Sequence, residues 1–347
     1  MRKAVITAIV LCACVLAMIS CNLDATIGIY SEVASSTPNR NVTLINYLGV
    51  NSAGNHFYQL DDGIYYTGRT SAVVKSTEKA RVIGSCLQGD VLYVMKESFS
   101  EDTKATTVTI SSIADPTAAE PVETLIPGGE NLRLMLTNGI VLGSSKAYYL
   151  DGGTLKDYGL DEFELNYAYE SENYALLSMT DKASSKQIIQ VVCNDGYYDI
   201  LLQAEDTRTF CGFQNFGSDE SFLLFYKDSS NKSYVMLFSK YGSEPVTTLA
   251  ELKSSLAKAD TYNASFCDYA NSTVIVKCTN YFDKINILDL DNVTVTPQNN
   301  GFAADICTAD IANIRKYKDN KFIVGTVSSL LYQIDMDDYS KNPVPID

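Results

Sequence analysis

The chain contains 347 residues, of which 46% are hydrophobic and 20% are charged, a composition typical of a folded globular protein. Its formal net charge of −15 argues against nucleic acid as a partner, because binding to phosphates requires a basic surface. His56 is the single histidine, which excludes a zinc site built from several histidines.

The first twenty residues have the pattern of an export signal. Arg2 and Lys3 form a positively charged start, and an uncharged, mostly apolar run follows from Ala4 to Ile19. This run is shorter than a membrane-spanning helix, which requires about 20 apolar residues, and its flanks are typical of a cleaved segment. We therefore predict a signal peptide at residues 1–20, with a retained membrane-anchor helix as the alternative.

The end of this run, Met18-Ile19-Ser20-Cys21, resembles a bacterial lipobox, in which a small residue precedes a cysteine that is diacylated and becomes the new N-terminus. Met18 stands where that motif prefers leucine. The resemblance implies lipidation at Cys21, a short lipidated tether at residues 21–25, and a place in a bacterial cell envelope. The lipid would anchor the protein to a membrane, on the periplasmic or surface-exposed side of the outer membrane. Ordinary secretory cleavage near Ser20 is the alternative.

The rest of the chain consists of short strand-like runs separated by turns rich in Gly, Asn, Asp and Ser. The strongest apolar runs recur at intervals that average about 44 residues, which is typical of propeller blades with four strands each. The pattern predicts an all-β fold in which residues 26–347 form a single seven-bladed β-propeller. A β-sandwich or another repeated-strand fold is the alternative. The runs are His56–Tyr58, Val91–Met95, Ile140–Leu142, Tyr174–Leu177, Phe222–Tyr226, Val274–Val276 and Phe322–Val324.

The resemblance is to the propeller superfold as a class, because the chain lacks the Trp-Asp and Gly-His pairs of WD40 blades. Leu249 to Ala259 has leucines at helical spacing and is expected to form a helix inserted between two blades. The last unit supplies three strand-like runs between Ile314 and Ile334, one strand short of a blade. We expect the N-terminal run Thr26–Val33 to pair with this unit and close the ring, which would remove exposed strand edges.

Six cysteines follow Cys21, and no two of them have the CxxC spacing of a zinc or redox site. Three of them each precede the strongest strand of their own unit, which predicts positions on the inner strands of three different blades. Isolated core thiols are therefore favoured over disulfides, although export would permit bridges. The three are Cys86, Cys211 and Cys267, and the others are Cys193, Cys278 and Cys307.

No residue pattern predicts a catalytic, cofactor or metal site. His56 is expected to be structural, and the acidic clusters at strand ends do not follow the order of an EF-hand loop. Asp161, Glu162 and Glu164 are candidates for the paired carboxylates of a glycoside hydrolase, but closeness in sequence does not fix the distance between carboxyl groups. Most of the 23 tyrosines are expected at β-favoured positions, and some on a propeller face would suit peptide or glycan binding.

Together these features predict a lipid-anchored cell-envelope protein that binds or scaffolds protein or glycan partners through one face of a propeller. The membrane would be contacted through the N-terminal lipid. The alternative is a propeller-type hydrolase or lyase acting on envelope glycans or peptides, with acids such as Asp161 and Glu164 converging at the centre of the ring.

Replacing Cys21 by alanine tests the anchor. Because the acyl chains would provide the attachment, Cys21→Ala should move the protein from the membrane pellet to the soluble fraction. Fractionation followed by immunoblotting measures this, with Cys12→Ala as the matched control that should stay in the pellet. A Cys21→Ala protein that still sediments with membranes after a high-salt wash would show that acylation at this position is wrong.

Overall fold

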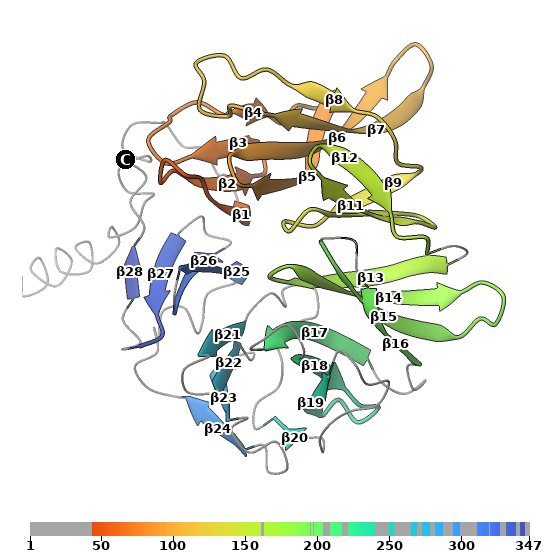
Figure 1. The fold of residues 1–347 in the computed structure, drawn as a ribbon, viewed down its shortest axis with the longest axis vertical. Coiled ribbons are helices and arrows are strands. Elements are labelled where there is room, and N and C mark those ends of the chain that lie inside the picture. Colours follow the sequence, from red (N-terminus) through yellow and green to blue (C-terminus); the bar gives the residue numbers. More distant parts are fainter. Residues whose placement is uncertain are drawn as a thin grey trace, which may run out of the picture.

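The computed structural model describes residues 44–160, 163–194, 196, 198–203, 209–216, 221–239, 250–252, 265–268, 273–277, 282–286, 294–298, 311–318, 320–326, 331–337 and 341–343. Every regular element within these ranges is a β-strand, and the 28 strands form seven four-stranded antiparallel sheets. The sheets follow one another around a ring (Figure 1), and we number them in chain order. The predicted all-β propeller fold is confirmed.

The first three sheets occupy the described chain up to residue 157. The first contains β1 (Leu44–Val50), β2 (His56–Leu60), β3 (Gly63–Tyr66) and β4 (Val74–Lys75). The second contains β5 (Ala80–Gln88), β6 (Val91–Ser100), β7 (Ala105–Ile113) and β8 (Thr124–Ile126). The third contains β9 (Leu132–Met135), β10 (Ile140–Gly143), β11 (Ala147–Asp151) and β12 (Thr154–Asp157).

The other four sheets follow the same plan. The fourth contains β13 (Phe163–Ser171), β14 (Tyr174–Asp181), β15 (Gln187–Cys193) and β16 (Tyr198–Gln203). The fifth contains β17 (Thr209–Phe216), β18 (Ser221–Lys227), β19 (Ser233–Ser239) and β20 (Ala250–Glu251). The sixth contains β21 (Ser265–Asp268), β22 (Thr273–Lys277), β23 (Phe282–Asn286) and β24 (Thr294–Gln298). The seventh contains β25 (Ile311–Lys318), β26 (Lys321–Thr326), β27 (Leu331–Asp335) and β28 (Lys341–Pro343).

The strongest apolar runs of the sequence are the second strands of the seven sheets: β2, β6, β10, β14, β18, β22 and β26. Neighbouring residues of such a strand point to opposite faces. In β6, Leu92 and Val94 pack in the core shared with the first sheet, whereas Tyr93 and Met95 pack in the core shared with the third. Because both faces of a second strand are buried, it forms a continuous apolar run instead of an alternating one.

The first strand of a sheet lies at the centre of the ring (Figure 1) and carries a repeated irregularity. In six sheets extra residues interrupt its pairing with the second strand. Four sheets have one, and the first and seventh have two, at Ile45, Leu48, Ile83, Arg133, Asn166, Cys211, Ala312 and Tyr317. A bulge bends a strand and increases its twist, which suits strands crowded around a narrow centre. The crowding is direct at Gly84, where an added Cβ would lie 2.8 Å from the Cβ of Met135.

The ring closes by side-chain packing between the seventh and first sheets. Ile323 and Leu331 share one core with Leu44, Tyr47 and Tyr58. The seventh sheet takes its fourth strand, β28, from the chain just after β27. The expectation that this unit is one strand short is therefore wrong. Its predicted partner, the run at residues 26–33, lies outside the described residues, as do the predicted signal peptide and tether.

The helix predicted from Leu249 to Ala259 is wrong where the structure describes it. Ala250 and Glu251 form β20 and pair with Val235 and Tyr234 of β19. The next residue, Leu252, is buried in the core, and its N–H donates to the carbonyl of Ser233. Pairing with the edge of the sheet and burial of Leu252 thus stabilise the strand more than the spacing of the leucines favours a helix. Residues 253–264 lie outside the described part of the chain.

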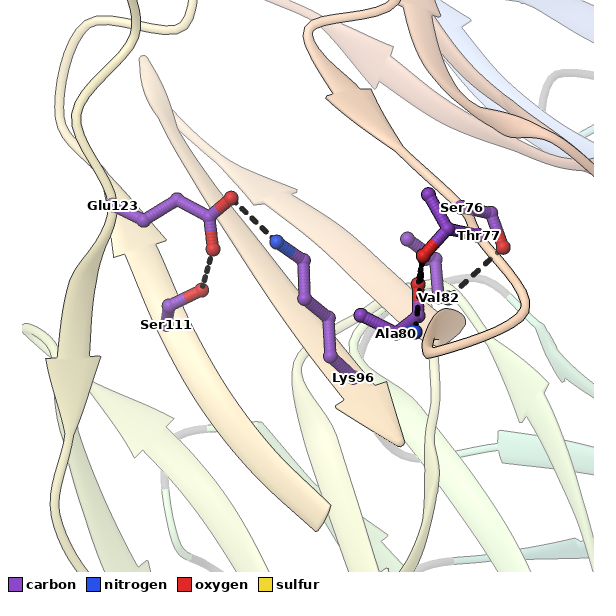
Figure 2. Close-up of polar contacts among 7 residues, drawn as sticks. All are labelled: Ser76, Thr77, Ala80, Val82, Lys96, Ser111 and Glu123. Atoms are coloured by element: carbon purple, nitrogen blue, oxygen red, sulfur yellow. Dashed lines mark hydrogen bonds and ion pairs between the residues drawn. The ribbon is translucent and has the colours of Figure 1, made fainter. Parts of the chain in front are cut away.

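Polar side chains attach the outer strand of the second sheet (Figure 2). Glu123, just before β8, accepts hydrogen bonds from Lys96 Nζ of β6 at 2.5 Å and from Ser111 Oγ of β7 at 3.0 Å. The Lys96 side chain is 18% exposed, so this pair is better shielded from water than a surface ion pair. At the start of the sheet, Thr77 Oγ1 accepts from the N–H of Ala80 at 3.0 Å.

Three of the cysteines are buried free thiols: Cys86 on β5, Cys193 at the end of β15 and Cys211 on β17. Cys86, Cys211 and Cys267 lie on first strands, as predicted. Burial raises the pKa of the Cys86 thiol to about 12. Cys21, Cys278 and Cys307 lie outside the described residues.

Thiol labelling tests this arrangement. In the native protein at pH 8, Cys86 should react slowly with a small thiol reagent, because it is buried and only the thiolate is nucleophilic. In denaturant without a reductant, Cys86, Cys193 and Cys211 should all be labelled, and mass spectrometry of the tryptic peptides measures the fraction. Cysteines that stay blocked until a reductant is added would contradict the free-thiol assignment.

Candidate functional site

A cavity of about 270 Å³ lies at the centre of the ring. Its walls come mainly from β13, β17 and β25, which are the first strands of the fourth, fifth and seventh sheets. The turn between β13 and β14 and Phe322 of β26 complete them. The cavity therefore lies at the end of the ring where first and second strands are joined, which we call the inner-hairpin end. The residues that give it its chemistry are Glu170, Glu172, Asn173, Phe213, Gln214, Arg315, Lys316 and Tyr317.

An ion pair crosses the centre of the ring beside this cavity. Arg315 belongs to β25 and Glu170 to β13, and their sheets stand on opposite sides of the ring in Figure 1. Arg315 Nη1 lies 3.6 Å from Glu170 Oε1, and the two side chains are 20% and 9% exposed. The pair thus joins two sheets that do not follow each other in sequence.

Glu170 is also held by the third sheet. The N–H of Thr137 donates to Glu170 Oε2 at 2.7 Å, and the Thr137 hydroxyl donates to Oε1 at 2.5 Å. Thr137 lies between β9 and β10, also at the inner-hairpin end. Two neutral donors and one cation therefore stabilise the carboxylate, which allows a charge to remain in a largely buried place.

The charge of Arg315 also acts on the first strands of the first and second sheets. Burial raises the pKa of the Tyr47 hydroxyl on β1 far above its ordinary value, and the positive charge of Arg315 opposes that rise in part. The same charge opposes the rise in the pKa of Cys86 on β5, while the negative charge of Glu170 adds to it. One guanidinium group is thus a shared electrostatic neighbour of the first, second and fourth sheets.

His56 supports one wall of the cavity. The Tyr47 hydroxyl and His56 Nδ1 share a hydrogen bond of 2.8 Å, and the His56 ring lies 5.3 Å from the ring of Tyr317 between centroids. Burial lowers the pKa of His56, so the ring is neutral at pH 7. The structure thus places His56 in an aromatic group that fixes Tyr317.

The acids considered from the sequence do not form the site. Asp161 and Glu162 lie outside the described residues, and Glu164 is exposed near the start of β13, away from the cavity that Glu170 borders. Among the described residues, no group of three or more His, Cys, Asp or Glu side chains is arranged to hold a metal ion.

Sequence reasoning missed Glu170 and Arg315. Glu170 directly follows the strand-like run Leu165–Tyr169, and Arg315 lies within the strand-like run Ile314–Tyr317. A charged residue inside a strand near the centre of a ring was the available signal, because such a charge requires a partner from another sheet. Every tyrosine whose exposure the structure describes is buried or half-buried, so β-favoured positions account for most of them, and Tyr317 is the one that lines the cavity.

Comparison with known proteins gives the class of the fold. No protein-family model matches the chain, and no curated protein matches its sequence. Solved structures do match: YCF48 from Cyanidioschyzon merolae has a TM-score of 0.54 at 9% identity, with 87% of this chain and 98% of that chain covered. YCF48 bound to D1 peptide has a TM-score of 0.51 at 10% identity, with 86% and 97% covered. Oligopeptidase B from Trypanosoma brucei, with covalently bound antipain, has a TM-score of 0.50 at 9% identity, with 91% and 50% covered.

Identities this low show the fold alone. The chain is a β-propeller protein, and the neighbours assign no residue of its cavity.

A double-mutant cycle tests the ion pair across the ring. Glu170→Gln should destabilise the fold by about 1–3 kcal/mol, because it leaves a largely buried guanidinium without its counter-charge. Adding Arg315→Met should recover part of that loss, as chemical denaturation would measure. The control is Lys79→Ala in the exposed Lys79–Glu101 pair, whose side chains are 79% and 64% exposed and which should change stability much less. Additive effects of the two central substitutions would show that the pair is not coupled.

Proposed function

We propose that this protein is a binding protein of a bacterial cell envelope, anchored to a membrane by a lipid on Cys21, that takes a protein or peptide partner at the inner-hairpin end of the ring. The observation that carries this proposal is the cavity at the centre of the ring, where charged, amide and aromatic side chains from three sheets meet.

The lining of the cavity has the composition of a ligand site. Phe213 is buried, Tyr317 is half-buried, and Asn173 and Lys316 are exposed at the rim. Binding sites commonly combine an apolar floor with a few polar groups that fix orientation. Phe213, Lys316 and Tyr317 stand on strands of packed sheets, so they are held in place before a partner arrives, which lowers the entropic cost of binding.

The size of the cavity favours a protein or peptide over a large cofactor. At about 270 Å³ it lies just below the usual range of small-molecule sites, roughly 300–1,000 Å³. Such a space accommodates a side chain or a terminal residue, while the rest of a partner would rest on the surrounding turns. The solved propeller bound to D1 peptide supports a peptide as a ligand for this fold.

The anchor rests on the sequence before the described residues. In the proposal, acyl chains on Cys21 attach the protein and residues 21–25 form the tether. Without residues 1–20, which contain Arg2 and Lys3, the net charge would be −17 (25 − 42), and this charge would keep the folded part away from anionic lipid head groups. Within the described residues, no helix is both long enough and apolar enough to cross a membrane.

The hydrolase alternative has less support from the described residues. Glycoside hydrolysis requires two carboxyl groups that face one substrate. Two acids, Glu170 and Glu172, border the cavity, but Glu170 is already engaged by Thr137 and Arg315. Glu164 is exposed on another part of β13. The described part of the site therefore supports binding better than acid–base catalysis.

Site-specific photo-crosslinking tests the proposed function. A photoreactive amino acid at Asn173, on the rim of the cavity, should give a discrete protein adduct in native membranes. The same residue at Asp102, exposed in the turn between β6 and β7, is the control and should give none. The partner identified by mass spectrometry, once purified, should then bind the full-length protein in a direct affinity measurement. Adducts that are equal at both positions, or absent at both, would contradict a binding site at the inner-hairpin end.

A further inference from the structure

We propose that the central cavity recognises a carboxylate of its partner, either a free C-terminus or an Asp or Glu side chain, through the guanidinium group of Arg315. This inference rests on the proposed function and adds the chemical group that the site selects.

The N–H donors of Arg315 are available to a ligand. Its side chain borders the cavity and is 20% exposed. Its one ion pair, with Glu170, spans 3.6 Å, which is longer than an N–H···O hydrogen bond of about 2.7–3.2 Å. Among the described residues the guanidinium makes no hydrogen bond, although it carries five N–H donors.

Glu170 as arranged does not satisfy the hydrogen-bonding capacity of this guanidinium. Each of its carboxylate oxygens accepts a hydrogen bond from Thr137, and Arg315 Nη1 lies 3.6 Å from Oε1. Glu170 therefore balances the charge of Arg315 but does not form a bidentate hydrogen-bonded pair with it. A ligand that offers two acceptor oxygens in one plane would form the two parallel hydrogen bonds that Glu170 does not provide.

The charges of the side chains that line the cavity favour a carboxylate over a phosphate as the ligand group. The cavity is lined by two acids, Glu170 and Glu172, and two bases, Arg315 and Lys316. A group with two negative charges would meet these acids with little net positive charge to offset them, whereas a carboxylate carries one charge and matches the planar fork of one arginine.

The remaining lining indicates what lies next to the carboxylate. Tyr317 is half-buried and held by the ring of His56, and the buried ring of Phe213 lies deeper in the same cavity. Aromatic rings pack well against apolar or aromatic side chains. We therefore expect a large apolar residue at, or next to, the position that carries the carboxylate.

The test uses the lipidated full-length protein in detergent and an array of ten-residue random-sequence peptides made in matched pairs. In one set of pairs the C-terminus is free or amidated, and in the other an internal Glu is retained or replaced by Gln. For the peptides that bind, the carboxylate member of a pair should bind at least about ten-fold more tightly than its amide partner, as expected for a charge-assisted bidentate contact. The set that shows the difference identifies the source of the carboxylate.

Three variants separate recognition from folding. Arg315→Met should reduce the ratio of the two binding affinities within each pair to about one. Arg315→Lys keeps the charge but loses the planar guanidinium group, and it should reduce this affinity ratio severalfold. Arg81→Met is the matched control: Arg81 pairs with Glu97 on the second sheet and is 66% exposed, so its ratio should equal that of the wild type. Arg315→Lys keeps the test valid if Arg315→Met fails to fold.

Two results would overturn the inference and leave the proposed function intact. If the wild type binds the carboxylate and amide members of each pair equally, the site does not select a carboxylate, although it still binds peptides. A carboxylate preference that survives in Arg315→Lys and Arg315→Met would assign it to another residue. If no peptide binds in any form, while crosslinking at Asn173 gives no adduct, the proposed function fails together with this inference.

Discussion

A strand that is apolar on both faces needs a neighbouring sheet on each side, and this requirement determines the architecture. In this chain it applies to the second strand of every sheet, so no single sheet can bury its own apolar surface. The shared cores that run from the first to the seventh sheet, and from the seventh back to the first, meet the requirement only when the ring is closed. Closure therefore follows from packing between Ile323 and residues such as Tyr58, without an exchanged strand within the described residues.

The ring brings seven first strands together, and their crowding creates the chemistry at the centre. Bulges bend these strands, and a glycine at position 84 allows β5 and β9 to approach. The same crowding lets Arg315 and Glu170 meet across the ring and places Thr137 against the carboxylate. A buried ion pair adds little net stability by itself, but here it holds a guanidinium next to a cavity with its donors open.

Binding and stability use different parts of the same sheets. The second strands are buried on both faces, whereas the cavity is lined mainly by first strands and by the turn between β13 and β14. Substitutions on the rim, for example at Asn173, can therefore change recognition with little cost to the core. A propeller often combines a rigid ring with variable turns, and this division explains how a chain so far from its structural neighbours in sequence keeps their fold.

The sequence by itself determined the all-β class, the repeat, the second strand of every sheet and the inner positions of Cys86, Cys211 and Cys267, because burial on both faces leaves a continuous apolar run that can be recognised locally. It did not determine β20 or β28, since edge strands of two or three residues carry almost no pattern of their own. The bulges were also hidden, because the extra residues, which include Ile45, Arg133 and Tyr317, have no residue type common to all of them. Only the tertiary structure decided the site: Arg315 and Glu170 lie far apart in the chain, and their contact depends on which sheets stand opposite each other in the ring.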